Sequence, residues 1–301
     1  MAGWLNNLRQ VAPEPNLNTG NGHAHCAVAE RAQGTSLPPQ RSQLLDSEFR
    51  SKGQEHFDAR DSYSGGSQVG NPYARSDDQV LATQLNNVFP MLGDFKKNGR
   101  LTLSSLEAIA KEDPKESKAL ECTIMLAREI LSRPRLADAI VAKGGEITSA
   151  SLEKVASYAT GNTHPNTQSA DPFHSKTDAQ VVQAFRGMFD DLRDPSQDSN
   201  FFFEKHRYVK KDKLIEMSKD PDETDKQGQV VRDAATGFPK KKYSELQVYM
   251  AKNLVERPGL LASLDSTKAN GTNLFGSHNN GSLKNYSIDR WLKNDKEEKG
   301  R

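Results

Sequence analysis

The chain has 301 residues, with 41 lysines and arginines against 40 aspartates and glutamates, and a formal net charge of +1. This balance gives no reason to expect the broad basic surface of a nucleic-acid-binding protein. The hydrophobic share is 35%, below the roughly 45–50% usual for globular domains, so part of the chain should bury no core.

No apolar run approaches the roughly 18 residues that a membrane span needs. The first residues also lack the apolar segment of a secretory signal. We therefore expect neither a transmembrane segment nor export by the Sec route.

Residues 1–77 are predicted to form a disordered arm. Apolar residues are isolated there among Gln, Asn, Ser, Gly and Pro, and turn-forming pairs such as Pro38-Pro39 and Asn71-Pro72 recur. Such a composition favours turns and a solvated chain over packed elements.

The densest group of metal-binding side chains is His23, His25 and Cys26 in this arm. Zn²⁺ accepts these ligands, but no second cluster follows at the spacing of a zinc site. The only other cysteine, Cys122, lies in a helical pattern, where a small buried and reduced residue is expected. The sequence therefore predicts neither a zinc site nor a disulfide framework.

A helical pattern begins at Asp78. Apolar residues at helical spacing define one face of this helix: Leu81, Leu85, Val88, Phe89 and Leu92. The same face returns with every position shifted by 100 residues: Val181, Phe185, Met188, Phe189 and Leu192. Since Asp78 and Asp94 also match Asp178 and Asp194, we predict an internal repeat.

Later in each copy, an apolar helical face is interrupted by a proline, at Pro134 and Pro258. Proline is tolerated in the first turn of a helix but disfavours helical geometry in the residue before it. Each segment is therefore predicted to be a helix, a break and a short second helix. A glycine-containing loop and a closing helix should follow, at 147–155 in the first copy and at 286–292 in the second.

These patterns predict a mainly α protein with two tandem helical units built from degenerate, EF-hand-like helix-loop-helix elements. The predicted parts are an arm at 1–77, a first unit at 78–160, a linker at 161–177, a second unit at 178–294 and a charged tail at 295–301. Polar, lysine-rich insertions at 198–211 and 220–242 make the second unit longer.

The segment 94–105 has the outline of a calcium-binding loop, with Asp94 at position 1, Asn98 at position 5 and Gly99 at position 6. However, Lys96 and Ser105 occupy positions 3 and 12, where such a loop supplies an oxygen ligand and a bidentate glutamate. A structural interpretation is favoured, in which Gly99 makes the turn, Leu101 enters the core, and Ser104 caps the next helix.

A second loop, at 276–287, has the same outline, with Gly281 at position 6 and Leu283 at position 8. It carries no carboxylate at a ligand position. Both loops are therefore interpreted as calcium-loop-like turns that bind no ion, and no metal site or cofactor is predicted.

No catalytic site is predicted either. The sequence contains no serine or cysteine in a strained glycine turn with a histidine partner, and no glycine-rich phosphate loop after a strand. Because folding brings distant residues together, an enzyme whose site is not visible in the sequence remains an alternative.

Two basic stretches, 205–213 and 240–242, have aromatic residues nearby and could bind nucleic acid or an anionic membrane. Interleaved acidic residues weaken their field, so solvated faces are expected. The run Phe201–Phe203 is either core or an exposed apolar patch suited to a protein partner.

The repeated order of motifs resembles the repeat region of the HrpF/NolX family of bacterial type III secretion translocator proteins. The first copy carries this resemblance in Asn98-Gly99-Arg-Leu-Thr, Pro114, Ile130-Leu131-Ser-Arg-Pro134-Arg-Leu136 and Ile147-Thr148. The second copy carries it in Leu254-Val255-Glu-Arg-Pro258-Gly-Leu260-Leu261-Ala-Ser-Leu264-Asp265 and Asn280-Gly281-Ser-Leu-Lys-Asn-Tyr-Ser287-Ile-Asp289.

The resemblance implies a protein that a bacterium secretes by a Sec-independent route, into or onto a host cell. We therefore predict a secreted effector or translocation accessory without enzymatic activity. The implied partner is a host or secretion-apparatus protein, with a secretion chaperone on the arm; membrane contact is compatible with this role, and nucleic acid is not expected. The alternative binding module is an EF-hand-like calcium-binding regulator.

Overall fold

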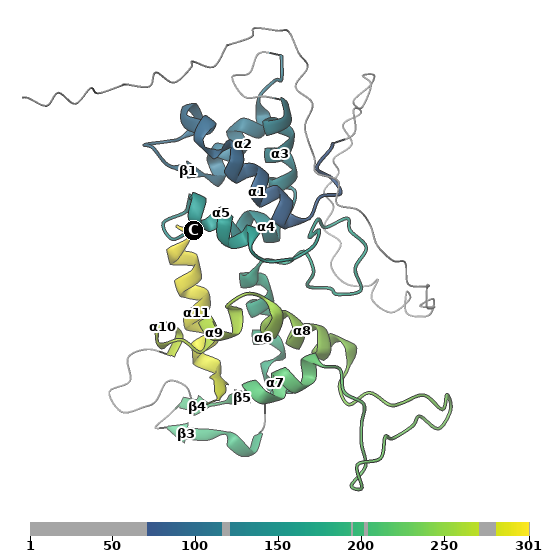
Figure 1. Cartoon of the computed structure of the whole chain (residues 1–301). Helices are drawn as coiled ribbons and strands as arrows, with labels where there is room; N and C mark the ends of the chain where they lie inside the picture. Colours follow the sequence, from purple (N-terminus) through teal and green to yellow (C-terminus); the bar gives the residue numbers. More distant parts are fainter. Residues whose placement is uncertain (1–70, 116–120, 194, 202–203, 271–280, 301) are drawn as a thin grey trace, which may run out of the picture. The chain divides into compact units, whose positions relative to one another are not determined.

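The computed structural model describes residues 71–115, 121–193, 195–201, 204–270 and 281–300. These residues form a mainly helical protein (Figure 1). The predictions for residues 1–70, including the cluster of His23, His25 and Cys26, lie outside the described residues, as do Phe202 and Phe203 and the first part, 276–280, of the loop at 276–287.

Residues 71–160, here called the first half, contain two helix-loop-helix segments. In chain order the elements are α1 (Asp78–Val88), the 3₁₀ helix η1 (Phe89–Phe95), β1 (Leu101–Thr102), α2 (Leu103–Lys111), α3 (Glu121–Leu131), α4 (Pro134–Ala139), β2 (Glu146–Ile147) and α5 (Ser149–Ala156). The predicted proline break is confirmed, because Pro134 begins α4 after the separate helix α3.

Residues 161–300, the second half, contain further elements between the corresponding helices. In chain order they are α6 (Asp178–Leu192), the 3₁₀ helix η2 (Pro195–Gln197), β3 (Ser199–Phe201), β4 (Glu204–His206), β5 (Tyr208–Lys210), α7 (Lys211–Ser218), α8 (Glu245–Glu256), α9 (Leu260–Leu264), α10 (Thr267–Asn270), β6 (Ser282–Lys284) and α11 (Asn285–Glu298). The break around Pro258 is likewise confirmed.

Helix α6 shows how local sequence fixes an element. Thr177 caps its N-terminus by accepting a hydrogen bond from the Gln180 backbone N–H, and the Gln180 side-chain oxygen accepts one from the Thr177 N–H. This reciprocal capping satisfies two backbone donors that the helix itself cannot pair. The predicted apolar face is buried except for the half-buried Met188, and Phe185 and Phe189 pack as a tilted ring pair with centroids 5.5 Å apart.

The core of the second half joins all four of its longer helices. It combines the apolar face of α6 with residues of α7, α8 and α11 and with one residue each from β5 and β6: Leu214, Met217, Met250, Leu254, Ile288, Val209 and Leu283. Since burying one such side chain contributes about 1.5–3 kcal/mol, these faces account for the folding of a chain with a low overall hydrophobic share.

A short antiparallel β-pair connects the two loops within each half. In the first half Leu101 of β1 lies opposite Ile147 of β2, and in the second half Val209 of β5 lies opposite Leu283 of β6. All four side chains are buried. Each half is therefore a pair of helix-loop-helix segments held together at the loops.

The predicted end of the arm at residue 77 is corrected by the structure. Residues 71–77 are ordered against the first half, where Tyr73 is buried and the Asn71 side chain donates to Glu129 at 2.7 Å. The predicted linker 161–177 is also packed, since Phe173 belongs to the core of the second half and Thr163 is fully buried. In both segments the sequence X-Pro-aromatic, which is typical of loops, forms a turn that packs its aromatic side chain against the helices.

The predicted charged tail is the end of a helix. Helix α11 continues to Glu298, because the charged residues beyond Leu292 are good helix formers and place Asp295 four residues before Lys299, with their side chains 2.8 Å apart.

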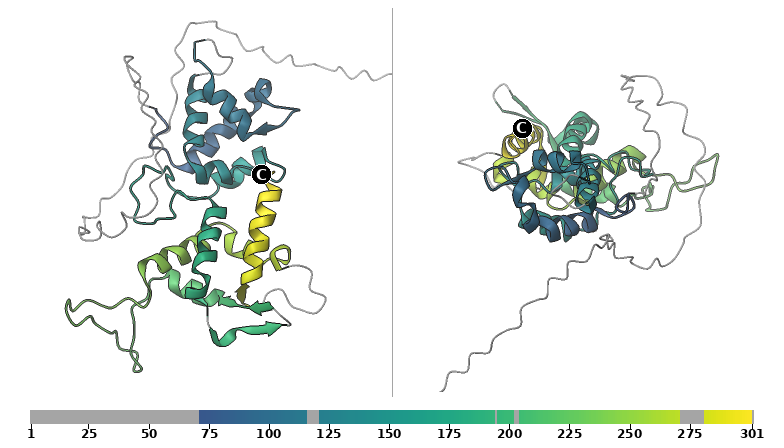
Figure 2. Two further views of the ribbon diagram at one scale, coloured as in Figure 1. Left: turned by 180° about the vertical axis from the view of Figure 1, so that it is seen from behind. Right: turned by 90° about the horizontal axis from the view of Figure 1, so that it is seen from above.

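The end of α11 contacts the first half (Figures 1 and 2). The Lys299 ammonium lies 2.7 Å from Asp138, and the Gly144 N–H donates to the Glu298 carbonyl at 2.7 Å. Burial opposes the charge on Lys299, but the Asp138 carboxylate outweighs it and raises the pKa of Lys299 above its usual value. The contact is therefore an ion pair at neutral pH.

The insertion at 220–242 forms an excursion between α7 and α8. It extends away from the helices in Figure 1 and in the views of Figure 2. It has isolated β-bridges, at Asp222–Lys241, Thr224–Val230 and Arg232–Pro239, and no buried side chain. None of the helices in the described ranges has the length and apolar character to cross a bilayer.

Candidate functional site

The loop at 94–105 has the predicted turn. Asn98 and Gly99 both have left-handed backbone conformations, with φ of 53° and 76°, and Leu101 is 1% exposed. The Lys96 ammonium lies 4.5 Å from the centroid of the Phe89 ring, a cation–π contact. The structural interpretation of Gly99 and Leu101 is thereby confirmed.

The predicted helix cap at Ser104 is wrong. Helix α2 begins at Leu103, and the Thr102 side chain accepts the hydrogen bond from the Ser105 N–H. Thr102 takes this place because it leaves the β1 pairing in an extended conformation, which is the geometry of an N-cap residue.

The paired loops of the first half are closed by an ion pair between Arg100 and Glu146, with the Nη1 and Oε1 atoms 2.9 Å apart. Across the ranges that the structure describes, no three histidine, cysteine, aspartate or glutamate side chains come together in a way that could hold a metal ion. A cation site would need several oxygen ligands around one point.

Cys122 differs from the prediction. It is half-buried and disulfide-bonded, so the prediction of a reduced, buried thiol is wrong. The only other cysteine of the chain, Cys26, lies outside the described residues. The pattern around Cys122 indicated a helix correctly, but it contained no signal for a bond to a distant residue.

The most elaborate polar site in the first half surrounds Arg133, whose side chain is fully buried. Its guanidinium donates to Glu129 at 2.7 and 2.9 Å and to Asp78 at 2.9 Å. It also donates to the backbone carbonyls of Ser76 at 2.7 Å and Tyr73 at 3.3 Å. Arg133 thus fixes the start of α1 and the turn before it to the end of α3.

The second half repeats this arrangement around Arg257, which is 4% exposed. Its guanidinium donates to Asp178 at 2.9 Å, to Asn253 at 2.9 Å, and to the carbonyls of Lys176 and Phe173 at 2.8 Å each. A buried charge is stable only when it is paired and hydrogen-bonded. Both arginines meet this condition with equivalent partners, and we call them the arginine anchors.

One pair of partners is exchanged between the anchors. In the first half the Asn71 amide donates to the Glu129 carboxylate at 2.7 Å, whereas in the second half the Asn253 amide donates to the Asp171 carboxylate at 2.8 Å. Each anchor therefore has one amide and one further carboxylate beside it. The carboxylate lies on helix α3 in the first half and on the turn before α6 in the second half.

The anchors were missed in the sequence because an arginine is usually interpreted as a surface residue. A signal was available. An Arg-Pro pair recurs at Arg133 and Arg257, and a Pro-aromatic pair recurs at Tyr73 and Phe173, within the same repeated framework.

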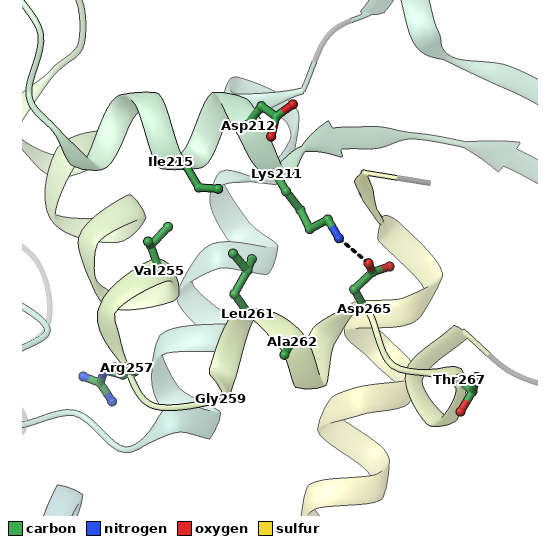
Figure 3. A pocket seen from close by; sticks show the side chains of 10 residues that line it. All are labelled: Lys211, Asp212, Ile215, Val255, Arg257, Gly259, Leu261, Ala262, Asp265 and Thr267. Carbon is green, nitrogen blue, oxygen red and sulfur yellow. Dashed lines mark hydrogen bonds and ion pairs between the residues drawn. The ribbon is translucent and has the colours of Figure 1, made fainter. Parts of the chain in front are cut away.

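A pocket of about 690 Å³ opens in the second half between α7, α8 and α9 (Figure 3). Its walls are aliphatic, with the half-buried side chains of Ile215, Val255 and Leu261 and the exposed Ala262. Lys211 and Asp265 form an ion pair of 2.5 Å at one side, and Asp212 lies at the rim. We call this pocket the α7–α9 groove.

The corresponding surface of the first half is closed. Ala137 and Asp138 of α4 take the places of Leu261 and Ala262 relative to the two anchors, and they are 8% and 4% exposed. Asp138 receives Lys299 from α11. Among the described residues Ala262 stays exposed, and an aliphatic groove remains in the second half, suited to an apolar group of a ligand or partner.

The predicted basic stretch 240–242 is neutralised by its neighbours. Lys240 pairs with Glu223, Lys241 with Asp220 and Asp222, and Lys242 with Glu216, with the ion-pair atoms 2.5–3.1 Å apart. These pairs also raise the pKa of the lysines. The stretch is therefore a solvated face with paired charges, as expected.

Comparisons with known proteins give no match. No family model, no curated protein and no solved structure is similar to this chain.

Proposed function

We propose that the protein is a bacterial type III secreted effector or translocation accessory, in which the two helical halves serve as a protein-interaction module and the N-terminal residues serve as the export arm. The proposal rests on the resemblance to the HrpF/NolX repeat region and on the polar composition of residues 1–70. It assigns no chemistry to the helical halves.

The observation that carries the interaction role is the state of the EF-hand-like loops. Their glycine turns and their buried β-pairs are intact, while Lys96 and Ser105 stand at positions 3 and 12 of the loop at 94–105, where ion ligands would be needed. Loops that have the turns and the β-pairing of an ion-binding fold, but not its ligands, support a role as a scaffold for a partner protein. The open α7–α9 groove gives this scaffold an apolar surface.

The export role of the arm is tested by secretion of a variant lacking residues 2–70 from a strain with a working type III apparatus. The deletion ends at residue 70 because Asn71 and Tyr73 pack against the first half. We expect secretion to be lost while the purified variant, which also lacks Cys26, still unfolds in a cooperative thermal transition.

The matched control for this test is a full-length variant with Lys241→Ala, which removes only exposed ion pairs of the kind that contribute little to stability. It should be secreted normally in the working strain and retained in a strain without the secretion ATPase. Undiminished, apparatus-dependent secretion of the 2–70 deletion would overturn the role of the arm.

An EF-hand-like calcium-binding regulator is the second candidate. The observation in its favour is the pairing of two helix-loop-helix segments through their loops in each half. Calcium titration separates it from the interaction module.

A further inference from the structure

Two of the differences between the halves are surface features of the second half. The excursion at 220–242 lies where a shorter connection joins the corresponding helices α2 and α3, and the α7–α9 groove is open where the first half is closed. One difference presents an apolar side chain, and the other presents an aliphatic cavity.

The excursion holds its apolar side chains in solvent. Phe238 is 72% exposed and Val230 is 45% exposed. Asp233 orders the turn before Phe238 by accepting hydrogen bonds from the backbone N–H groups of Ala235 and Thr236, at 3.0 and 2.8 Å. A large aromatic side chain on a turn ordered in this way loses little conformational entropy on binding and is typical of an interaction anchor.

The charges beside these two features are complementary. Arg232 forms a β-bridge with Pro239, next to Phe238, and its guanidinium donates to the Gly237 carbonyl at 2.9 Å. Asp212 lies at the rim of the groove. Within the described ranges, neither Arg232 nor Asp212 takes part in an ion pair.

We propose that the protein associates with a second copy of itself, with Phe238 of each copy inserted into the α7–α9 groove of the other and Arg232 facing Asp212. Insertion in both directions between the same two copies makes the contact reciprocal, and a reciprocal contact closes as a two-fold dimer. The groove volume of about 690 Å³ leaves ample room for one phenyl ring. This inference is independent of the secretion role.

The test is sedimentation velocity of the full chain from micromolar to millimolar concentration, on the wild type and two variants. Phe238→Ala removes the inserted side chain, and Ala262→Trp fills the groove from an exposed position without disturbing the core. Each variant should weaken dimerisation at least about tenfold, the effect of losing a buried aromatic anchor. Met91→Ala, at another exposed large side chain, should leave the dimer unchanged.

An equimolar mixture of the two variants distinguishes this contact from a folding defect. The Ala262→Trp copy retains Phe238 and the Phe238→Ala copy retains an open groove, so the mixture regains one of the two contacts. We expect the mixture to associate more strongly than either variant alone. A monomeric wild type at all concentrations, or variants that dimerise like the wild type, would overturn the proposal.

Discussion

The two halves of the molecule use the same anchor arrangement at different depths. In the first half Arg133 and both of its carboxylate partners are buried, with Asp78 and Glu129 side chains 2% and 5% exposed. In the second half Arg257 is buried, but Asp178 is 41% exposed. The same hydrogen-bond arrangement around an arginine is therefore present in both halves. Its contribution to stability differs, because water reaches the carboxylate partner in the second half only.

The depth of the anchors predicts the largest effect. Arg133→Met leaves two carboxylates buried without their cation and should destabilise the protein by about 3–5 kcal/mol. Arg257→Met leaves a carboxylate that water reaches, and should cost roughly 2 kcal/mol through lost hydrogen bonds to a charged group. Urea unfolding of both variants measures the difference, and equal losses would contradict the comparison.

The helices could be predicted from the sequence, whereas the recurring Arg-Pro pairs could mark the two anchor arginines but not the residues that they contact. The buried faces of α1 and α6 can be recognised in the sequence, because a helix that buries one side carries apolar residues at helical spacing. The contacts of Arg133 depend on Asp78 and the turn at Tyr73, more than 50 residues earlier, and no local pattern encodes that distance. The α7–α9 groove was equally hidden, since it depends on whether Ala262 is covered by another element.

Exchanging the amide and the carboxylate tests whether the two anchors are equivalent. Asn71→Asp alone places a second carboxylate against Glu129, and Glu129→Asn alone removes an anion from Arg133; each should destabilise the first half by roughly 1–3 kcal/mol. The double variant reproduces the arrangement of Asp171 and Asn253 in the second half.

We expect the double variant to lose less stability than the sum of the single changes, with a coupling within the roughly 0.5–3 kcal/mol seen for contacting residues. Urea unfolding of the four proteins in a double-mutant cycle measures it. Simple additivity would mean that the two sites are not interchangeable.

The turn at Gly99 gives the smallest of these effects. Its φ of 76° is left-handed, so Gly99→Ala should cost about 1–2 kcal/mol in backbone strain although a Cβ would meet no neighbour. Gly93→Ala is the matched control, because a Cβ there also has open space and φ is not positive. Thermal unfolding should shift for the first variant and stay within about 0.5 kcal/mol for the second.

The central claim that we propose is that the loop at 94–105 serves as a structural turn and not as an ion site. Titration calorimetry of the full chain with millimolar Ca²⁺, paired with thermal unfolding in Ca²⁺ and in chelator, tests it most directly. We predict no binding heat and the same unfolding temperature in both conditions. Saturable binding at one or more sites, with an unfolding temperature raised by Ca²⁺, would contradict the claim and favour the calcium-binding regulator.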